Sequence, residues 1–201
     1  MPGRELVLAT RNDHKVAEVT RLLAPFDLSV IPLPPAVNLP PEDGESYAAN
    51  ALIKARAGSR VLGRAVIADD SGIEAAALGG APGIRSARYA GEHATDKQNL
   101  EKLLREVPPG DALAYVCALA YVDPQEGVEQ MFVGSCGGSL DPRPRGERGF
   151  GYDPVFLPDD GPPGLTMAEL SDDQKDAISH RGKAARALLQ WLEQSAVPTA
   201  G

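Results

Sequence analysis

The chain has 201 residues, 43% of them hydrophobic, which is enough for one domain with a sizeable core. Its formal net charge of -8 argues against a broad basic surface for DNA, RNA or acidic membranes, so any polyanionic ligand has to be bound by a local group of cations. No stretch resembles a signal peptide or the ~18 apolar residues of a membrane span, and we expect a soluble cytoplasmic protein that binds neither nucleic acid nor membrane.

The first segment predicts a strand, a polar loop and a helix. Residues 5–9 are apolar, and apolar residues recur at helical spacing after the loop at 10–15, TRNDHK. A helix N-terminus offers free N–H groups and the positive end of a dipole, both of which suit a phosphate. The positive charge of Lys15 in the first turn is unfavourable beside the positive end of the dipole unless an anion is bound. Simple capping of the helix by Asn12 or Asp13 explains the other polar residues but not this lysine.

A second strand is expected at 28–31, followed by a proline-rich loop at 32–44 and a helix at 46–62. Asn50 and Lys54 lie one turn apart in this helix, so their side chains point the same way. On these residues alone, a solvent-exposed pair is the simpler interpretation.

The stretch AVIADDSG at 65–72 is the most informative one. An apolar run ends in two adjacent carboxylates, Asp69 and Asp70, followed by a serine and a glycine. Two buried carboxylates repel each other, so a fold keeps them there only if a turn solvates them or a cation neutralises them. The pattern fits a turn after a buried strand and a metal-binding acid site equally well, and residues 73–75 then continue extended.

The second half of the chain predicts a helix, a hairpin and two C-terminal helices. The helix is expected at 96–106, and two strands at 112–122 and 130–137 flank a turn rich in polar residues. A capping-box pattern, Ser-x-x-Gln, begins at Ser171, and a final amphipathic helix follows. The mixed order of strands and helices indicates an α/β sheet.

Six short motifs occur in order along the chain. They are ATRNDHK at 9–15, ANALIKA at 49–55, ADDSG at 68–72, LGGAPGIRSARYAG at 78–91, GFGYDP at 149–154 and KDAISHRGKA at 175–184. Together they resemble the inosine triphosphate pyrophosphatase family, the non-canonical purine nucleoside triphosphate pyrophosphatases. The resemblance implies a single domain over residues 1–201, with a long mixed β-sheet and two α/β lobes flanking a substrate cleft. It also implies a homodimer and Mg2+-dependent hydrolysis of ITP, dITP and XTP to the monophosphate and pyrophosphate.

The resemblance also assigns roles around the phosphates. The residues implied to contact the substrate there are Thr10, Arg11, Asn12, Asp13, His14, Lys15, Lys54, Ser71 and Lys175. Glu42 and Asp70 are the implied ligands of Mg2+, which prefers oxygen ligands and binds through few carboxylates. Asp70, together with Asp69, is the implied base that orients or deprotonates the attacking water.

A second group of residues is implied to contact the purine base. Its members are Phe150, Gly151, Tyr152, Asp153, His180 and Arg181. The two aromatics on either side of the glycine present an aromatic face to the base, or one of them plugs the core. Hypoxanthine and xanthine carry an acceptor at O6 where adenine carries a donor, so the N–H donors of the histidine and arginine should reject adenine.

The sequence leaves two alternative functions open and predicts how the chain assembles. A Maf-type nucleotide pyrophosphatase shares the broad fold but lacks the SHR and FGYDP motifs. A non-catalytic nucleotide-sensing module would not need the intact Asp69, Asp70 and Lys15. The resemblance and the apolar segments around residues 82–87 predict a C2 homodimer, the commonest closed assembly.

Overall fold

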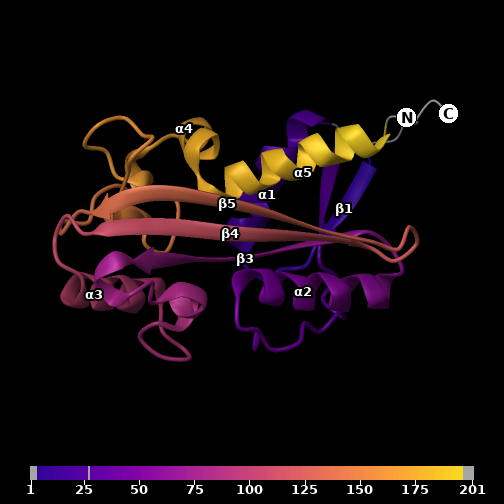
Figure 1. Ribbon diagram of the computed structural model, residues 1–201, viewed down its shortest axis with the longest axis horizontal. Helices are drawn as coiled ribbons and strands as arrows, with labels where there is room; N and C mark the ends of the chain where they lie inside the picture. The colour runs from indigo at the N-terminus through magenta and orange to yellow at the C-terminus, as the bar shows by residue number, and fades with distance from the viewer. Residues whose placement is uncertain (1–3, 27, 197–201) are drawn as a thin grey trace. The chain divides into compact units, whose positions relative to one another are not determined.

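The computed structural model describes residues 4–26 and 28–196 of the chain. Its strands form one sheet in the order β2-β1-β3-β4-β5-β6 (Figure 1). The strands are β1 (Arg4–Leu8), β2 (Leu28–Pro32), β3 (Val66–Ala75), β4 (Ala112–Asp123), β5 (Val128–Leu140) and β6 (Phe156–Pro158). The α-helices are α1 (Asp13–Leu23), α2 (Tyr47–Leu62), α3 (Asp96–Glu106), α4 (Asp172–Ile178) and α5 (His180–Ala196). Short 3-10 helices are η1 (Ala24–Phe26), η2 (Ala76–Leu78), η3 (Gly83–Arg88), η4 (Asp153–Val155) and η5 (Met167–Glu169).

The sheet is mixed. Strand β1 pairs with β2 and β3 in parallel, whereas β5 pairs with β6 antiparallel. This confirms the predicted α/β class. In the part of the chain that the structure describes, no helix combines the length and the apolarity needed to cross a membrane.

The chain forms two compact units. The first unit consists of Met1–Asp70, Ala118–Val133 and Arg181–Gly201, and the second consists of Ser71–Cys117 and Gly134–His180. Strands β3, β4 and β5 each contribute one part to the first unit and the other part to the second.

In the first unit, helices cover both faces of the strands. Helix α2 lies on one face, and α1 and α5 lie on the other (Figure 1). Ser46 begins α2 by accepting a hydrogen bond from the backbone N–H of Ala49, and Gly63 ends it in the left-handed conformation. The core beneath α2 contains many small side chains, among them Ala51, Ala55, Val66, Ala68, Ala118 and Ala120. Small residues on both surfaces let the helix backbone lie close to the sheet.

The second unit has its own apolar core. That core includes Leu100 and Leu103 from α3, Cys136 from β5 and Phe156 from β6. Helix α3 begins with a capping box, and so does α4, where the predicted box that starts at Ser171 is confirmed.

One predicted element is wrong. The alternative of a turn at Asp69 and Asp70 fails, because β3 runs without interruption through both residues to Ala75. Strand β6 was not predicted, and β5 extends three residues further than expected, to Leu140. How β3 carries two adjacent acids is explained by the surroundings of each carboxylate.

Candidate active site

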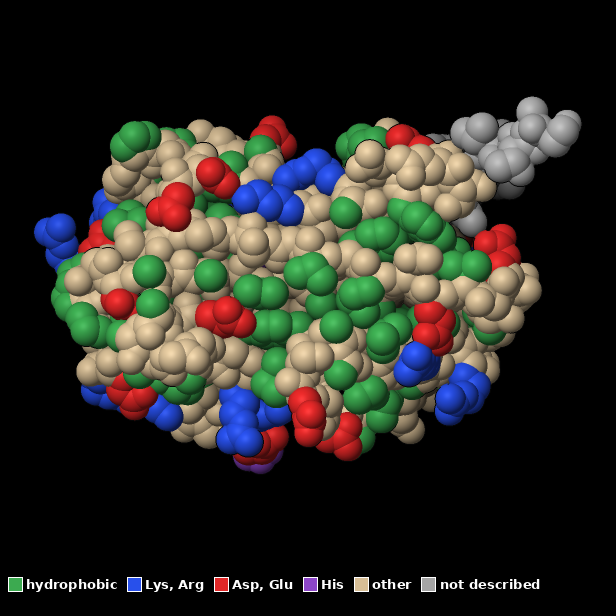
Figure 2. Space-filling view, viewed as in Figure 1, with side chains coloured by type: hydrophobic (Ala, Val, Ile, Leu, Met, Phe, Trp, Pro, Cys, Tyr) green, Lys and Arg blue, Asp and Glu red, His purple; other side chains and the backbone are tan. Residues whose placement is uncertain are grey.

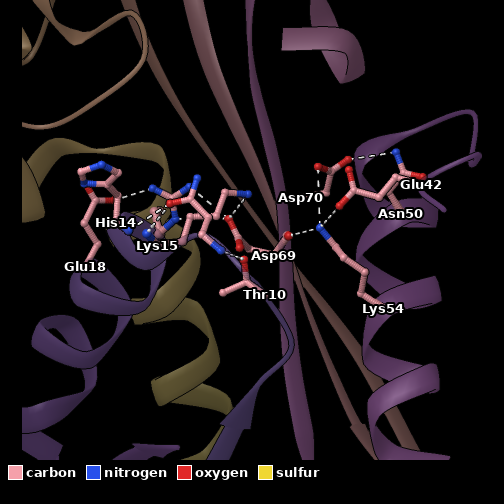
Figure 3. A network of polar contacts seen from close by, with 11 residues as sticks. Thr10, His14, Lys15, Glu18, Glu42, Asn50, Lys54, Asp69 and Asp70 are labelled. Carbon is pink, nitrogen blue, oxygen red and sulfur yellow. Dashed lines mark hydrogen bonds and ion pairs between the residues drawn. The ribbon is translucent and has the colours of Figure 1, made fainter. Parts of the chain in front are cut away.

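Successive residues of a strand point to opposite faces of the sheet, and this alternation separates the two aspartates of β3. Figure 3 shows Asp69 on the side of α1 and α5, and Asp70 on the side of α2. Each carboxylate is therefore neutralised by its own group of side chains. We call these groups the Asp69 cluster (Lys15, Glu18, Asp69, Arg181) and the Asp70 cluster (Glu42, Asn50, Lys54, Asp70).

The Asp69 cluster is a buried network of charges. One carboxylate oxygen of Asp69, Oδ2, lies 3.0 Å from Lys15 Nζ and 3.0 Å from Arg181 Nη2. The remaining guanidinium nitrogens of Arg181 reach the same oxygen and the carboxylate of Glu18. Asp69 and Arg181 are almost fully buried, with exposed fractions of 0% and 1%. Helices α1 and α5 thus meet β3 through ion pairs that water does not screen.

This surrounding keeps Asp69 ionised. Burial alone would raise the pKa of the Asp69 carboxyl, but the charges of Lys15, Arg181 and Lys54 outweigh burial and lower it. A carboxylate with a strongly lowered pKa is a poor proton acceptor. Asp69 is therefore suited to orient Lys15 and Arg181 rather than to accept a proton from water.

The Asp70 cluster lies on the other face of β3. Asn50 Nδ2 donates to Asp70 Oδ2 at 3.0 Å, while its own Oδ1 accepts from the backbone N–H of Gly44 at 2.8 Å. Lys54 Nζ donates to Glu42 Oε1 at 2.5 Å and to the backbone carbonyl of Asp69 at 2.7 Å, and it lies 3.9 Å from Asp70 Oδ1. The one-turn spacing of Asn50 and Lys54 therefore aims both side chains at β3, and the interpretation as a solvent-exposed pair is wrong (Figure 3).

The protonation of the Asp70 cluster differs from that of the Asp69 cluster. Burial raises the pKa of Asp70, and the nearby charge of Glu42 adds to this, although Lys54 and Asn50 oppose it. Burial would lower the pKa of Lys54, but the charges of Asp69, Glu42 and Asp70 outweigh burial and raise it. The cluster thus combines a lysine that stays charged with a carboxyl group whose proton affinity is raised, which is the property of a general base.

Glu42 and Asp70 fit the chemistry of a magnesium site. Oxygens of both carboxylates lie within 4.0 Å of Lys54 Nζ, so the fold already gathers them around one positive charge. Among residues 4–26 and 28–196, no three His, Cys, Asp or Glu side chains come together in a way that would hold a metal. Mg2+ typically takes one or two carboxylates and fills its other positions with water and substrate phosphates, so two carboxylates suffice.

The loop at 10–15 caps α1. Asn12 accepts hydrogen bonds from the backbone N–H groups of His14 and Lys15, which is the capping that the sequence left as an alternative. Thr10 Oγ1 in turn accepts from the backbone N–H of Asn12. The side chains of Asp13 and His14 are exposed. A phosphate contact by this loop stays a prediction.

Arg11 takes a position that the sequence did not predict. Its guanidinium donates to the backbone carbonyls of Leu33 at 2.7 Å, Pro34 at 2.9 Å and Val37 at 2.6 Å. Arg11 thereby holds the start of the proline-rich loop, whose far end carries Glu42. The arginine supports the loop that supplies a candidate metal ligand.

The aromatic loop, residues 149–154, lies in the second unit and is arranged around Asp153. Oδ2 of Asp153 accepts from the backbone N–H of Phe150 at 2.9 Å and from Lys175 Nζ at 2.6 Å. Tyr152 is buried and donates through its hydroxyl to the backbone carbonyl of Ser86, so it is the aromatic that plugs the core. Phe150 is only half-buried and lies below Lys175 Nζ, with 5.3 Å from the nitrogen to the ring centre.

The remaining predicted residues are divided between the units. Lys175 lies with Asp153 in the second unit, whereas Lys15 and Lys54 lie in the first. Gly151 has φ of +63°, and a Cβ added there would meet nothing within 4 Å, so its backbone conformation explains the glycine. Ser71 follows Asp70 in β3 and is half-buried.

Comparison with known proteins identifies the family. Residues 6–191 match the Ham1 family. The chain belongs to the Ham1 family. It is 44% identical to a dITP/XTP pyrophosphatase of Cutibacterium acnes over 195 residues, which cover 92% of this chain and 94% of that protein. It is 47% identical to a dITP/XTP pyrophosphatase of Geobacillus kaustophilus over 199 residues, which cover 94% and 95%.

Solved structures of Ham1 proteins have the same fold. A HAM1 protein from Coxiella burnetii matches with a TM-score of 0.82 at 36% identity, covering 95% of this chain and 99% of that one. A nucleoside-triphosphatase, dITP/XTP pyrophosphatase, from Mycobacterium abscessus matches with a TM-score of 0.70 at 42% identity, covering 92% and 98%. These matches confirm the family that the six motifs predicted, and they do not favour a Maf-type enzyme.

Three residues of this Ham1 chain were missed by reasoning from the sequence. Glu18 pairs with Arg181, and Tyr115 donates to Asp153. Asp96, in the first turn of α3, accepts from the backbone N–H of Gly151 at 3.0 Å. A signal existed only for Glu18, which lies three residues after Lys15 and so on the same face of α1.

Proposed function

We propose that this chain hydrolyses dITP, XTP and ITP to the nucleoside monophosphate and pyrophosphate, with Mg2+ as cofactor. Its relatives are named dITP/XTP pyrophosphatase and nucleoside-triphosphatase, and this chain is, like them, a hydrolase acting on phosphoric anhydrides. The observation that carries the proposal is the Asp70 cluster, where a buried carboxyl of raised pKa lies beside a second carboxylate and a lysine. The proposal places the enzyme in the cytoplasm, acting as a homodimer on free nucleotides.

Asp70 is proposed to accept the proton of the attacking water. Burial raises the pKa of its carboxyl, so it binds a proton more readily than an exposed aspartate. Asn50 fixes the orientation of the carboxyl by donating to Oδ2, which leaves Oδ1 toward Lys54. A base whose orientation is fixed loses little freedom when the water binds.

Lys54 and Lys15 supply positive charge that the chain as a whole lacks. The net charge is -8, yet each aspartate of β3 has a lysine beside it. When bound at Glu42 and Asp70, Mg2+ would neutralise charge that develops on the phosphate oxygens. Together these cations stabilise a transition state in which charge is spread over the transferring phosphoryl group.

Selection of the base is assigned to the aromatic loop and to His180, both of which lie in the second unit. N–H donors match the O6 acceptor of hypoxanthine and xanthine and oppose the amino group of adenine. A site built on such hydrogen bonds discriminates by roughly 10⁴, because the wrong base leaves buried groups unpaired.

The test is pyrophosphate release from a panel of ITP, dITP, XTP, ATP and GTP, each with Mg2+ and with EDTA. We expect kcat/KM for ITP and XTP at least ~10²-fold above that for ATP and GTP, and loss of activity in EDTA. Equal hydrolysis of ATP and ITP by the unmodified protein would overturn the assigned substrate class. Full activity in EDTA would overturn the assigned cofactor.

A further inference from the structure

Tyr115 is a buried residue of β4 that no motif singles out. Its hydroxyl contacts the aromatic loop, and its ring contacts His180. These two stretches are far apart in the sequence, and both are assigned to the base. A single side chain thus joins two parts of the proposed base site.

The hydroxyl fixes the acid at the centre of the aromatic loop. Tyr115 Oη donates to Asp153 Oδ1 at 3.1 Å, while the other oxygen of Asp153 accepts from the backbone N–H of Phe150 and from Lys175 Nζ. Both carboxylate oxygens are therefore held by donors from different elements. Burial and the neighbouring carboxylate raise the pKa of Tyr115 well above its usual value, so the hydroxyl stays a donor at neutral pH.

The ring of Tyr115 fixes the imidazole of His180. The two rings are stacked, with centroids 4.7 Å apart and an angle of 6° between their planes. Phe156 packs against the Tyr115 ring at 4.7 Å with an angle of 52° between the planes. The tyrosine is thus held by its neighbours, and a flat contact with it restricts rotation of the histidine ring.

We propose that Tyr115 is a positioning residue for base recognition, because one rigid side chain sets both the backbone of the aromatic loop and the orientation of His180. This inference rests on the proposed function, in which these two stretches contact the purine. A preorganised surface binds its ligand more tightly, since less freedom is lost on binding. Tyr115 should therefore affect binding of the base more than binding of the phosphates, which it reaches only through Asp153 and Lys175.

The experiment compares two ligands, each measured by calorimetry with Mg2+. Deoxyinosine monophosphate carries the base, whereas inorganic pyrophosphate carries phosphates alone. Tyr115→Phe removes the hydroxyl and keeps the ring, and Tyr115→Leu removes both. Tyr121→Phe is a matched control, because Tyr121 is also a buried tyrosine of β4 and its hydroxyl contacts a carboxylate, that of Asp123 at 3.3 Å.

We expect Tyr115→Phe to weaken binding of deoxyinosine monophosphate about three- to tenfold, an effect of the size of one ordinary hydrogen bond, because the lost bond acts on the ligand only through Asp153. Tyr115→Leu should weaken it further, because the stacked ring is lost as well. Binding of pyrophosphate should weaken less than binding of deoxyinosine monophosphate in both Tyr115 variants, and Tyr121→Phe should change binding of neither ligand. If Tyr115→Leu does not fold, Tyr115→Phe decides the question alone.

Two results would contradict the positioning role. One is unchanged affinity of Tyr115→Phe for deoxyinosine monophosphate, and the other is an equal loss of affinity for both ligands. Failure of the proposed function gives a different result, in which the unmodified protein binds deoxyadenosine monophosphate as tightly as deoxyinosine monophosphate. The two failures are therefore distinguishable.

Discussion

Asp69 and Asp70 are neighbouring residues of β3 with identical side chains, but their pKa values shift in opposite directions. Asp69 faces Lys15 and Arg181, which lower its pKa, whereas Asp70 faces Asn50 and Lys54 in surroundings where burial raises its pKa. The strand separates the roles because neighbouring residues point to opposite faces. The two aspartates were predicted together as catalytic, and the geometry favours Asp70 as the base.

The first prediction concerns turnover. Asp70→Asn is nearly isosteric but cannot accept the proton, so kcat with saturating Mg2+ should fall by about 10²-fold or more. Pyrophosphate release from saturating ITP measures it. The fold should survive, because the amide oxygen of the substituted side chain can still accept a hydrogen bond from Asn50. Near-normal turnover of the Asp70→Asn variant would contradict the assignment of the base.

The second prediction concerns stability, and its sign differs between the two aspartates. The pKa of Asp69 is lowered below 3.8, so ionised Asp69 stabilises the fold above that pH and the contribution is lost only as pH falls further. Asp69→Asn should thus lower stability at pH 7 by about 3–5 kcal/mol, the cost of breaking a buried ion pair. The pKa of Asp70 is raised above 3.8, so its ionisation destabilises the fold as pH rises through the folded value. Asp70→Asn should therefore raise the unfolding temperature at pH 7, with a gain that shrinks toward pH 4.

Thermal unfolding followed by circular dichroism in EDTA, at about pH 4 to 8, measures both effects. EDTA is needed because bound metal would stabilise the native state on its own. If Asp69→Asn and Asp70→Asn change the unfolding temperature at pH 7 in the same direction, the surroundings of the two carboxyls do not shift their pKa values in opposite directions.

Part of the site could be predicted from residue types alone. The positive charge of Lys15 is unfavourable at a helix N-terminus without a bound anion, and Lys54 lies one turn from Asn50 on the same face of a helix. The local sequence therefore marks Lys15 and Lys54 as candidate site residues. Tyr115 and Asp96 carry none, because each acts on a loop that lies far away in sequence and only tertiary packing brings them together. Arg11 was predicted on the substrate, yet its side chain holds backbone carbonyls of the loop at 33–37.

At the scale of elements, periodicity predicted the long helices and the central hairpin well. Helix α2, helix α3 and strand β4 lie where their apolar patterns place them, and β5 includes the predicted strand at 130–137 but is longer. The predicted turn at Asp69 was wrong because Asp, Ser and Gly are typical turn residues, and residue type alone does not show their neighbours in the fold. Cations from α1, α2 and α5 neutralise the two aspartates and let β3 continue through them. Strand β6 was missed because three residues give too short a pattern.

The third prediction concerns the aromatic loop. Gly149 has φ of +72°, and a Cβ there would lie 2.0 Å from Asp153 Oδ2 and 3.0 Å from Lys175 Nζ. Gly149→Ala should displace the carboxylate from its lysine and cost about 3 kcal/mol or more in the free energy of unfolding. Gly164→Ala is the matched control, because Gly164 has φ of +77° but nothing within 4 Å of an added Cβ. Its cost should be only the backbone strain of about 1–2 kcal/mol.

Urea unfolding measures both free energies, and binding of deoxyinosine monophosphate shows whether the loop has moved. Gly149→Ala should lose affinity for this ligand, whereas Gly164→Ala should keep it. Equal losses of stability in the two variants would mean that Asp153 relaxes away from the added methyl group without cost.

At the scale of the whole molecule, a surplus of acidic residues coexists with the proposed site for polyanions. The chain carries 28 Asp and Glu against 20 Lys and Arg, so long-range attraction does not bring triphosphates to it. Lys15, Lys54 and Arg181 instead act within buried clusters, where opposite charges are close and screening is weak. The proposed binding of the phosphates by Lys15 and Lys54 therefore depends on local geometry rather than on net charge.

The last prediction is the homodimer. Figure 2 shows apolar side chains gathered on the visible face, and Ala87, in the segment at 82–87 that the sequence predicts as the interface, is exposed. Burial of apolar surface in a closed C2 assembly offsets the repulsion between two chains that each carry a charge of -8. We expect light scattering at micromolar concentration to give twice the 21.1 kDa of one chain. Added salt should strengthen the association, because it screens the repulsion.

Two charge substitutions test which surface forms this dimer. Ala87 is exposed in η3, within the segment at 82–87 that the sequence predicts as the interface, and Ala87→Arg should yield monomers. Val133→Arg is the matched control on β5 and should leave the mass doubled. A mass of 21.1 kDa for the unmodified protein would reject the dimer. If only Val133→Arg yields monomers, the interface includes β5 instead of the segment at 82–87. The reason is that an arginine is tolerated on an exposed surface but not in a buried apolar contact.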